Sequence, residues 1–262
     1  MNVENNCIID VHAHLGNIKE FYNPDISVGT ILNTMDSLQI DKLLQAHMIL
    51  FYDEYEKGIS ESIEAFEKSK GRILSYLVFN PRKPDRSLKV INDNINKEQF
   101  IGIKIAPSVH LYPADGENYD IIWEYASKNN TVLLTHSWAI SRTNPNQVYA
   151  QVKLFEKYLK KYPEIKLILG HSGGLEEGIR KAVKLARIYP NVYLDISGDI
   201  LFFGLIEFLV ENAGADKILF GSDLTMLDPR INLSRVLTAR INIEAKRKIL
   251  GLNACHLFRL QC

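Results

Sequence analysis

The stretch IIDVHAHLG, residues 8–16, places two histidines, His12 and His14, directly after a short apolar run. An apolar run of this kind predicts a buried β-strand, here over residues 7–11. Side chains of an extended chain alternate between two faces, so His12 and His14 point the same way. Two neighbouring imidazoles repel each other when charged and lack partners when buried and neutral. A metal ion would resolve both problems, and the stretch therefore predicts a strand that ends in a candidate metal site.

Apolar runs and helix-like segments alternate along the rest of the chain. The eight predicted strands cover residues 7–11, 42–50, 73–80, 101–106, 132–136, 166–170, 192–196 and 218–221. Segments with helical spacing cover residues 53–70, 115–130, 146–163 and 174–190. In the third segment, Val148, Val152, Phe155 and Leu159 recur at steps of three and four, which predicts an amphipathic helix.

This alternation predicts one (β/α)8 TIM barrel, a single α/β domain over residues 1–262. The strands are continuously apolar, which suits a parallel sheet covered on both faces. An open doubly wound sheet is the main rival, but it would usually have fewer strands. For nucleotide binding it would also need a glycine-rich first turn, and VHAHLGN, residues 11–17, does not match one. The tail from Ile249 predicts a short closing helix packed on the barrel.

Composition limits the partners of the chain. Lys plus Arg and Asp plus Glu each number 31, so the formal net charge is zero, and nucleic acid is not expected as a partner. Cys7, Cys255 and Cys262 are scattered and form no CxxC, which argues against a disulfide framework or a thiolate metal site and favours a reducing compartment. No stretch reads as a signal peptide or a membrane span. We therefore expect a cytoplasmic protein that acts on a small molecule, with a homodimer as the default assembly.

Polar side chains recur where the predicted strands end. They are His12 and His14 at the first strand, Lys104 within the fourth, His136 and His171 at the ends of the fifth and sixth, and Asp223 after the eighth. In a parallel barrel the carboxyl ends of all strands meet at one rim, where active sites are built. Each residue alone fits a structural role, such as a hydrogen-bonded histidine or a helix-capping aspartate. Together they predict one pocket whose imidazoles and carboxylate suit zinc, or manganese or iron, better than calcium or magnesium.

In this order and spacing, the stretches resemble the amidohydrolase superfamily of metal-dependent TIM-barrel enzymes, and most of all its amidohydrolase-related ("amidohydrolase 2") branch. The resemblance covers essentially the whole chain and rests on DVHAHLG, GIKIAP with HLYPADG behind it, LLTHS, LILGHSGG, VYLDISG, ILFGSD and ILGLNACHLF. It implies that His12, His14, His136 and Asp223 bind one divalent metal. It also implies that His171 lies beside the metal-bound water, as an orienting group or a general acid/base.

The resemblance leaves the role of Lys104 open. Some relatives hold two metals bridged by a carboxylated lysine on the fourth strand, at the place of Lys104. The branch nearest this chain often functions with one metal, so one ion is expected and Lys104 is free to bind an anionic group of the substrate. His110, in the following loop, is a candidate substrate contact. Further candidates are His47, Trp138, Arg142 and Asp199, and the loops also carry Lys19 and Tyr22.

Two kinds of chemistry fit these residues. A metal-activated water would hydrolyse an amide, lactone or ester-like bond, with Asp223 taking its proton and passing it to the leaving group. This hydrolase is the main prediction. The alternative is a metal-dependent, non-oxidative decarboxylase of a small aromatic or unsaturated carboxylic acid, which an aromatic-lined pocket would favour. A phosphoesterase would want more cationic groups near the metal than Lys104. A non-catalytic metal-binding barrel is the last possibility.

Overall fold

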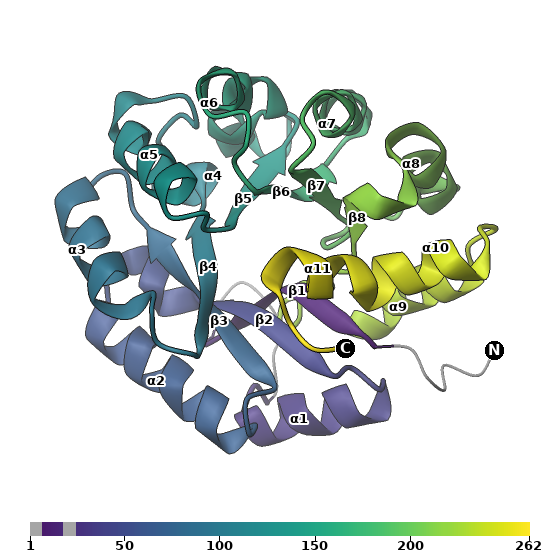
Figure 1. Ribbon diagram of the computed structural model, residues 1–262, viewed down its shortest axis with the longest axis horizontal. Coiled ribbons are helices and arrows are strands. Elements are labelled where there is room, and N and C mark those ends of the chain that lie inside the picture. Colours follow the sequence, from purple (N-terminus) through teal and green to yellow (C-terminus); the bar gives the residue numbers. More distant parts are fainter. Residues whose placement is uncertain (1–6, 18–24) are drawn as a thin grey trace.

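Eight parallel strands follow one another in chain order around a single sheet (Figure 1). The computed structural model describes residues 7–17 and 25–262, so Lys19 and Tyr22 lie outside the described residues. The strands are β1 (Ile9–Leu15), β2 (Lys42–His47), β3 (Ile73–Phe79), β4 (Phe100–Ile105), β5 (Leu133–Trp138), β6 (Leu167–Gly173), β7 (Val192–Asp195) and β8 (Ile218–Leu219). Each neighbouring pair from β1 to β8 is parallel.

Hydrogen bonds between β1 and the segment after β8 bring the two edges of the sheet together. The Val11 amide donates to the Phe220 carbonyl at 2.9 Å, and the Asp223 amide donates to the His12 carbonyl at 2.8 Å. Because both edges are joined in this way, the sheet closes into a barrel. The predicted single-domain (β/α)8 TIM barrel is confirmed.

Most helices form a ring outside the strands, and α11 lies across one end of the barrel (Figure 1). The helices are α1 (Val28–Ser37), α2 (Tyr55–Lys68), α3 (Pro84–Asn94), α4 (Pro107–His110), α5 (Asp120–Lys128), α6 (Glu156–Lys161), α7 (Glu176–Ile188), α8 (Leu205–Ala213), α9 (Pro229–Thr238), α10 (Ile243–Arg247) and α11 (Asn253–Phe258). Three of them begin with proline, whose fixed φ and missing N–H suit the first helical position. In the described part of the chain, no helix has the length and apolar character needed to cross a membrane.

The strands bury side chains on both faces, as their continuous apolar character predicts. One face, with Leu43, Leu77 and Leu133, packs against the outer helices. The other face, with Leu44, Tyr76 and Leu134, fills the barrel interior, where Leu257 and Phe258 of α11 join the same cluster. The closing helix predicted from Ile249 is thus present, and α11 packs against β1 and β8 at the amino end of the strands.

Several strands end elsewhere than predicted, among them β5, β6 and β8, and the first two strands show why. β1 begins at Ile9 and continues to Leu15, so His12 and His14 lie within the strand and not after it. The strand continues because its ladder with β2 extends as far as Leu15 opposite His47. β2 ends at His47, because Met48–Tyr52 turn into a 3-10 helix.

The helix predicted over residues 146–163 was wrong as a single element. The structure has two 3-10 helices, Pro145–Ala150 and Val152–Phe155, followed by α6. Gln151 between them is extended (φ −64°, ψ 137°), which interrupts the helical path. Val148 consequently lies on the surface, whereas Val152 and Phe155 are buried.

The cysteines differ from the prediction as well. The chain contains a disulfide between Cys255 and Cys262, where the sequence argued against a disulfide framework. The tail after α11 turns back because Arg259 adopts a left-handed conformation (φ 56°), and the Leu260 amide donates to the Cys255 carbonyl at 3.0 Å. The spacing of Cys255 and Cys262 in the sequence did not indicate that the chain reverses between them.

Candidate active site at the carboxyl ends of the strands

Two histidines of β1 and one aspartate after β8 converge at the carboxyl end of the barrel. His12 Nε2 and His14 Nε2 lie 3.6 Å and 3.4 Å from the same atom, Asp223 Oδ1. All three side chains are buried, and Asp223 Oδ1 has no hydrogen-bond partner among the described residues. A buried carboxylate oxygen without a donor is costly unless a cation satisfies it. These three side chains could therefore hold a divalent metal ion.

The far side of each imidazole is fixed by a hydrogen bond. His12 Nδ1 donates to Asp195 Oδ2 at 2.8 Å, and His14 Nδ1 donates to the Ala46 carbonyl at 3.1 Å. Burial lowers the pKa of both histidines. Both Nε2 atoms then direct a lone pair toward Asp223, which is the arrangement that metal-ligating histidines show in proteins. The donor set fits zinc, manganese or iron.

Asp223 is held as a carboxylate in a strained backbone conformation. Burial alone would raise its pKa, but the neighbouring imidazoles of His171 and His12 hold the pKa of Asp223 well below its usual range. Asp223 and His171 both have left-handed backbones, with φ of 65° and 58°. Non-glycine residues in this region cost free energy and cluster at functional sites, where the surrounding structure holds them in place.

His136 and His171 form a second group beside the first. His171 Nε2 lies 3.0 Å from His136 Nδ1, and His136 Nε2 donates to Gln147 Oε1 at 2.9 Å. His171 Nδ1 lies 3.0 Å from Ser197 Oγ and 3.7 Å from Asp223 Oδ2. Burial lowers the pKa of His136 well below its usual value, and the adjacent His171 lowers it further. The structure thus brings His136 against His171 and not against the His12, His14 and Asp223 cluster.

Lys104 reaches the cluster from β4. Its Nζ lies 2.6 Å from His12 Nε2, and its side chain is 2% exposed. Burial lowers the pKa of Lys104 to about 8, although the carboxylates of Asp195 and Asp223 oppose the shift. The lysine is therefore positioned to reach the same atom of His12 that faces Asp223.

A cavity of about 980 Å³ opens above these side chains. Three aromatic side chains, Phe51, Tyr52 and Trp138, line it together with aliphatic ones. The rest of the wall is polar and includes Ser108, Ser141, Thr143, Asn144, Asn146 and Gln147. Trp138 stacks on His136 with ring centres 6.1 Å apart and 6° between the planes. A Cβ at Gly174 (φ +76°) would collide with the Trp138 ring, so glycine there permits this wall. Among the described residues, Lys104 is the only lysine or arginine in the lining.

The remaining predicted contacts are divided between the cavity and its surroundings. Trp138 and Asp199 line the cavity. His110 is buried behind its wall, where Nε2 donates to the Phe51 carbonyl at 3.1 Å. His47 Nε2 lies 2.8 Å from the Glu61 carboxylate, and Arg142 is exposed on the loop after β5. Substrate contacts by these residues stay predictions.

Four residues at the site were missed from the sequence. Asp195 and Ser197 support His12 and His171, and Gln147 holds His136. Asp10 accepts hydrogen bonds from the amides of His12 and Ser222, and burial raises its pKa to about 7. Asp195 ends an apolar run just as His136 and His171 do, so the same pattern could have identified it. Gln147 gave no such signal, because it lies within a helix-like segment.

Comparison with known proteins identifies a family for this barrel. A family model described as "Amidohydrolase" matches residues 9–260. A sequence comparison with curated proteins finds no match. Solved structures that match include 2,6-dihydroxybenzoate decarboxylase from Rhizobium, at 16% identity and a TM-score of 0.75 over 97% of this chain and 98% of the other.

Two further structures of this kind were determined with manganese. One is 5-carboxyvanillate decarboxylase from Novosphingobium aromaticivorans, at 14% identity and a TM-score of 0.76 over 98% of this chain and 97% of the other. The second is dihydroxybenzoic acid decarboxylase from Polaromonas, at 17% identity and a TM-score of 0.75 over 97% of each chain. At such identities the likeness shows the fold.

Proposed function

The chain belongs to the amidohydrolase family, and from this premise we propose that it is a metal-dependent, non-oxidative decarboxylase of a small hydroxylated aromatic carboxylic acid. The observation that carries the proposal is the cavity directly above His12, His14 and Asp223, with Phe51 and Trp138 in its walls. Its volume of about 980 Å³ exceeds the space that a single benzene ring with its substituents needs. The decarboxylase names of the similar structures support the same substrate class.

The charges of the site suit a carboxylate substrate. We propose that His12, His14 and Asp223 hold the metal, with His136 as the further ligand that the family resemblance implies. When bound, a divalent cation at this position supplies the positive charge that anchors the carboxylate and adjacent hydroxyl oxygens. Lys104 can place its ammonium beside the same oxygens, because its Nζ already reaches His12 Nε2. The aromatic side chains of the wall hold the ring and exclude water around the charged groups.

Decarboxylation requires one proton at the ring carbon. The bond from that carbon to the carboxylate breaks, CO₂ leaves, and a proton takes its place. We assign the transfer of this proton to His171 and Asp223, whose Nδ1 and Oδ2 atoms lie 3.7 Å apart. Ser197 Oγ contacts the same Nδ1 of His171, and His136 contacts its Nε2, so the imidazole is oriented before substrate binds. Acid/base catalysis of this kind contributes roughly 10²- to 10⁴-fold in rate.

The same ligands limit which metal the site can hold. Two histidines and a carboxylate suit zinc or manganese, and the manganese in the two similar decarboxylases supports manganese. Zinc, the main prediction from the sequence, has support only from the donor set. We propose one divalent ion per chain, with Lys104 left free for substrate.

Hydrolysis, the main prediction from the sequence, has weaker support than decarboxylation. Both reactions use the same metal-binding residues and the same acid/base pair. What separates them is the pocket, and a cavity with Phe51, Tyr52 and Trp138 in its wall and one described lysine suits an aromatic acid better than a peptide-like or lactone chain. The comparisons also name decarboxylases.

The test is CO₂ release from a panel of hydroxybenzoates, including 2,6-dihydroxybenzoate and 5-carboxyvanillate. The protein is loaded with manganese or zinc, and a parallel panel of lactones, esters and amides is assayed for hydrolysis. Asp223→Asn is the matched control for a metal-site reaction. We expect turnover on at least one hydroxybenzoate, lost in the variant. Turnover confined to the acyl panel would overturn decarboxylation in favour of hydrolysis.

A further inference from the structure

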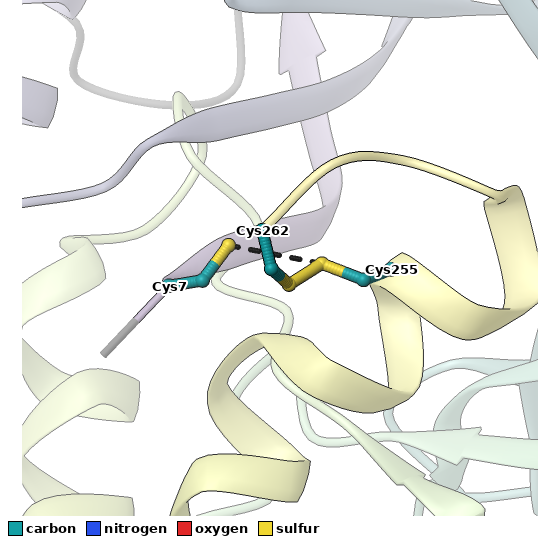
Figure 2. Close-up of side chains that lie close together, drawn as sticks. All are labelled: Cys7, Cys255 and Cys262. Carbon is teal, nitrogen blue, oxygen red and sulfur yellow. Dashed lines mark hydrogen bonds between the residues drawn. A yellow bond between two sulfur atoms is a disulfide. The ribbon is translucent and has the colours of Figure 1, made fainter. Parts of the chain in front are cut away.

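All three cysteines of the chain meet at the closed end of the barrel, opposite the candidate active site (Figure 2). Cys255 and Cys262 are joined by a disulfide, and the Cys7 thiol lies beside it. The Sγ atoms of Cys7 and Cys255 are 3.7 Å apart, although 248 positions separate these residues. The Cys7 thiol donates this contact, because a disulfide sulfur carries no hydrogen.

The fold brings Cys7 to this position by a close backbone approach. Cys7 directly precedes Ile8 and β1, and it packs against the π-helical turn Lys248–Leu252 that leads into α11. A Cβ at Gly251 would collide with the carbonyl oxygen of Cys7, so only glycine allows this approach. Cys255 lies one helical turn after Gly251 and therefore faces the same segment.

The tail brings Cys262 to the same place from the other side. Arg259 reverses the chain after α11, and the Leu260 amide is held by the Cys255 carbonyl at 3.0 Å. Cys262 is exposed and follows this turn by three residues, whereas Cys7 is half-buried. Cys255 thus stands between two possible partners, one at each end of the described chain.

We propose that Cys7, Cys255 and Cys262 form a thiol–disulfide switch, in which Cys255 exchanges its disulfide partner between Cys262 and Cys7. In one form the disulfide spans 7 positions and fastens the tail to α11. In the other form it spans 248 positions and joins the start of β1 to α11. The second form covalently connects the first and last elements of the described chain and releases Cys262 as an exposed thiol.

The exchange needs no external oxidant. The Cys7 thiol loses its proton, and its thiolate attacks Cys255 Sγ. A bond forms between Cys7 and Cys255 as the bond between Cys255 and Cys262 breaks. Cys262 leaves as a thiolate and takes up a proton, so one disulfide and one thiol are present before and after.

Burial controls the rate of this step. Burial raises the pKa of the Cys7 thiol, and the nearby Asp41 carboxylate raises it further. The thiol therefore stays protonated at neutral pH, and the disulfide with Cys262 persists. Because the thiolate is the nucleophile, the exchange should become faster as the pH rises.

The experiment maps the disulfides of the full chain by mass spectrometry. Protein carrying the Cys255–Cys262 disulfide is incubated without added thiol at pH 6.5 and pH 8.5, acid-quenched and alkylated before digestion. Cys262→Ser, oxidised with oxidised glutathione, removes the competing partner. Cys7→Ser is the matched control, since it keeps the disulfide of the tail and lacks the attacking thiol.

The proposal predicts a peptide pair linked through Cys7 and Cys255 in the wild-type protein and in Cys262→Ser. In the wild-type chain it should appear together with alkylated Cys262, and it should form at least tenfold faster at pH 8.5 than at pH 6.5. In oxidised Cys262→Ser it should be the main species. The absence of this linked pair from either protein would overturn the exchange. So would equal alkylation of Cys262 in Cys7→Ser, because release would then not depend on Cys7.

Discussion

His14 Nε2 and Asp223 Oδ1 lie 3.4 Å apart, and the aspartate oxygen has no hydrogen-bond partner in the described part of the chain. One residue comes from the first strand and the other from the loop after the last strand. The closing hydrogen bond of the barrel, from the Asp223 amide to the His12 carbonyl, holds the two segments in this position. Closure of the sheet and assembly of the candidate metal site are therefore the same structural event.

Replacing Asp223 with Asn should lower kcat by at least about a hundredfold, because the variant loses both a metal ligand and a proton carrier. The amide keeps the size of the side chain, so the fold should persist. Turnover of the best hydroxybenzoate, measured with metal in excess, checks the prediction. Unchanged kcat would remove Asp223 from the reaction. Replacement of Asp93, exposed on α3 and outside the cavity lining, is a suitable control.

Replacing Asp195 with Asn should weaken metal binding by roughly 10- to 100-fold, the usual cost of losing a carboxylate behind a ligating histidine. Asp195 Oδ2 accepts the Nδ1 proton of His12 and so fixes the orientation of that ring. Competition with a chelator of known affinity measures the change. Wild-type affinity in the variant would mean that His12 is not a ligand, or that its orientation does not depend on this hydrogen bond.

The family resemblance and the geometry assign different roles to His136. The family resemblance implies a metal ligand, whereas the structure places Nδ1 against His171 and Nε2 against Gln147. We expect His136→Gln to lose metal affinity by at least tenfold, as a ligand should. Metal content at matched free-metal concentration is the measurement. Retained metal with lost turnover would instead assign His136 to the orientation of His171.

The sequence predicted the barrel because its signals are local. Apolar runs such as those at Ile73 and Leu167 mark the strands, and polar residues at their carboxyl ends mark the rim, which the barrel topology then brings together. The same logic placed His12, His14 and Asp223 in one site. It failed where a contact depends on how loops fold, since neither the Gln147 contact nor the tail reversal at Arg259 has a periodic signal.

Strand boundaries were less predictable than strand existence. β1 extends through His14, because pairing with β2 and not apolar character decides where it ends. The residues at the strand ends also could not decide between hydrolysis and decarboxylation. That choice depends on side chains from separate elements, including Phe51 of the 3-10 helix after β2, Trp138 at the end of β5 and Met226 after β8, which meet only in the folded cavity.

Metal content per chain decides the role of Lys104. Protein purified without added metal should contain about one equivalent, measured by inductively coupled plasma mass spectrometry. Lys104→Met should keep that value but raise KM for the acid substrate by at least about tenfold, because a charged hydrogen-bond donor is lost. Lys166→Met, in a different cavity, is the control. Two equivalents in the wild type, falling to one in Lys104→Met, would make Lys104 a bridging ligand instead.

The stability of the protein should depend on pH through His110. Burial lowers the pKa of His110 to about 4, while its Nε2 donates to the Phe51 carbonyl. An unfolded histidine has a pKa of about 6.5, so on acidification the unfolded chain takes up the proton first. The contribution of neutral His110 to stability is therefore complete above pH 6.5 and is lost as the pH falls toward 4.

His110→Gln isolates this contribution, because glutamine can still donate to the Phe51 carbonyl but does not titrate. Between pH 7.5 and pH 5.0, the free energy of unfolding of the wild type should fall by about 2 kcal/mol more than that of the variant. Urea denaturation of both proteins at the two pH values measures the difference. The other buried histidines contribute equally to the pH dependence of both proteins, so their contributions cancel in the difference. Equal pH dependence would mean that His110 is protonated as easily in the folded chain as in the unfolded one, and so is open to water.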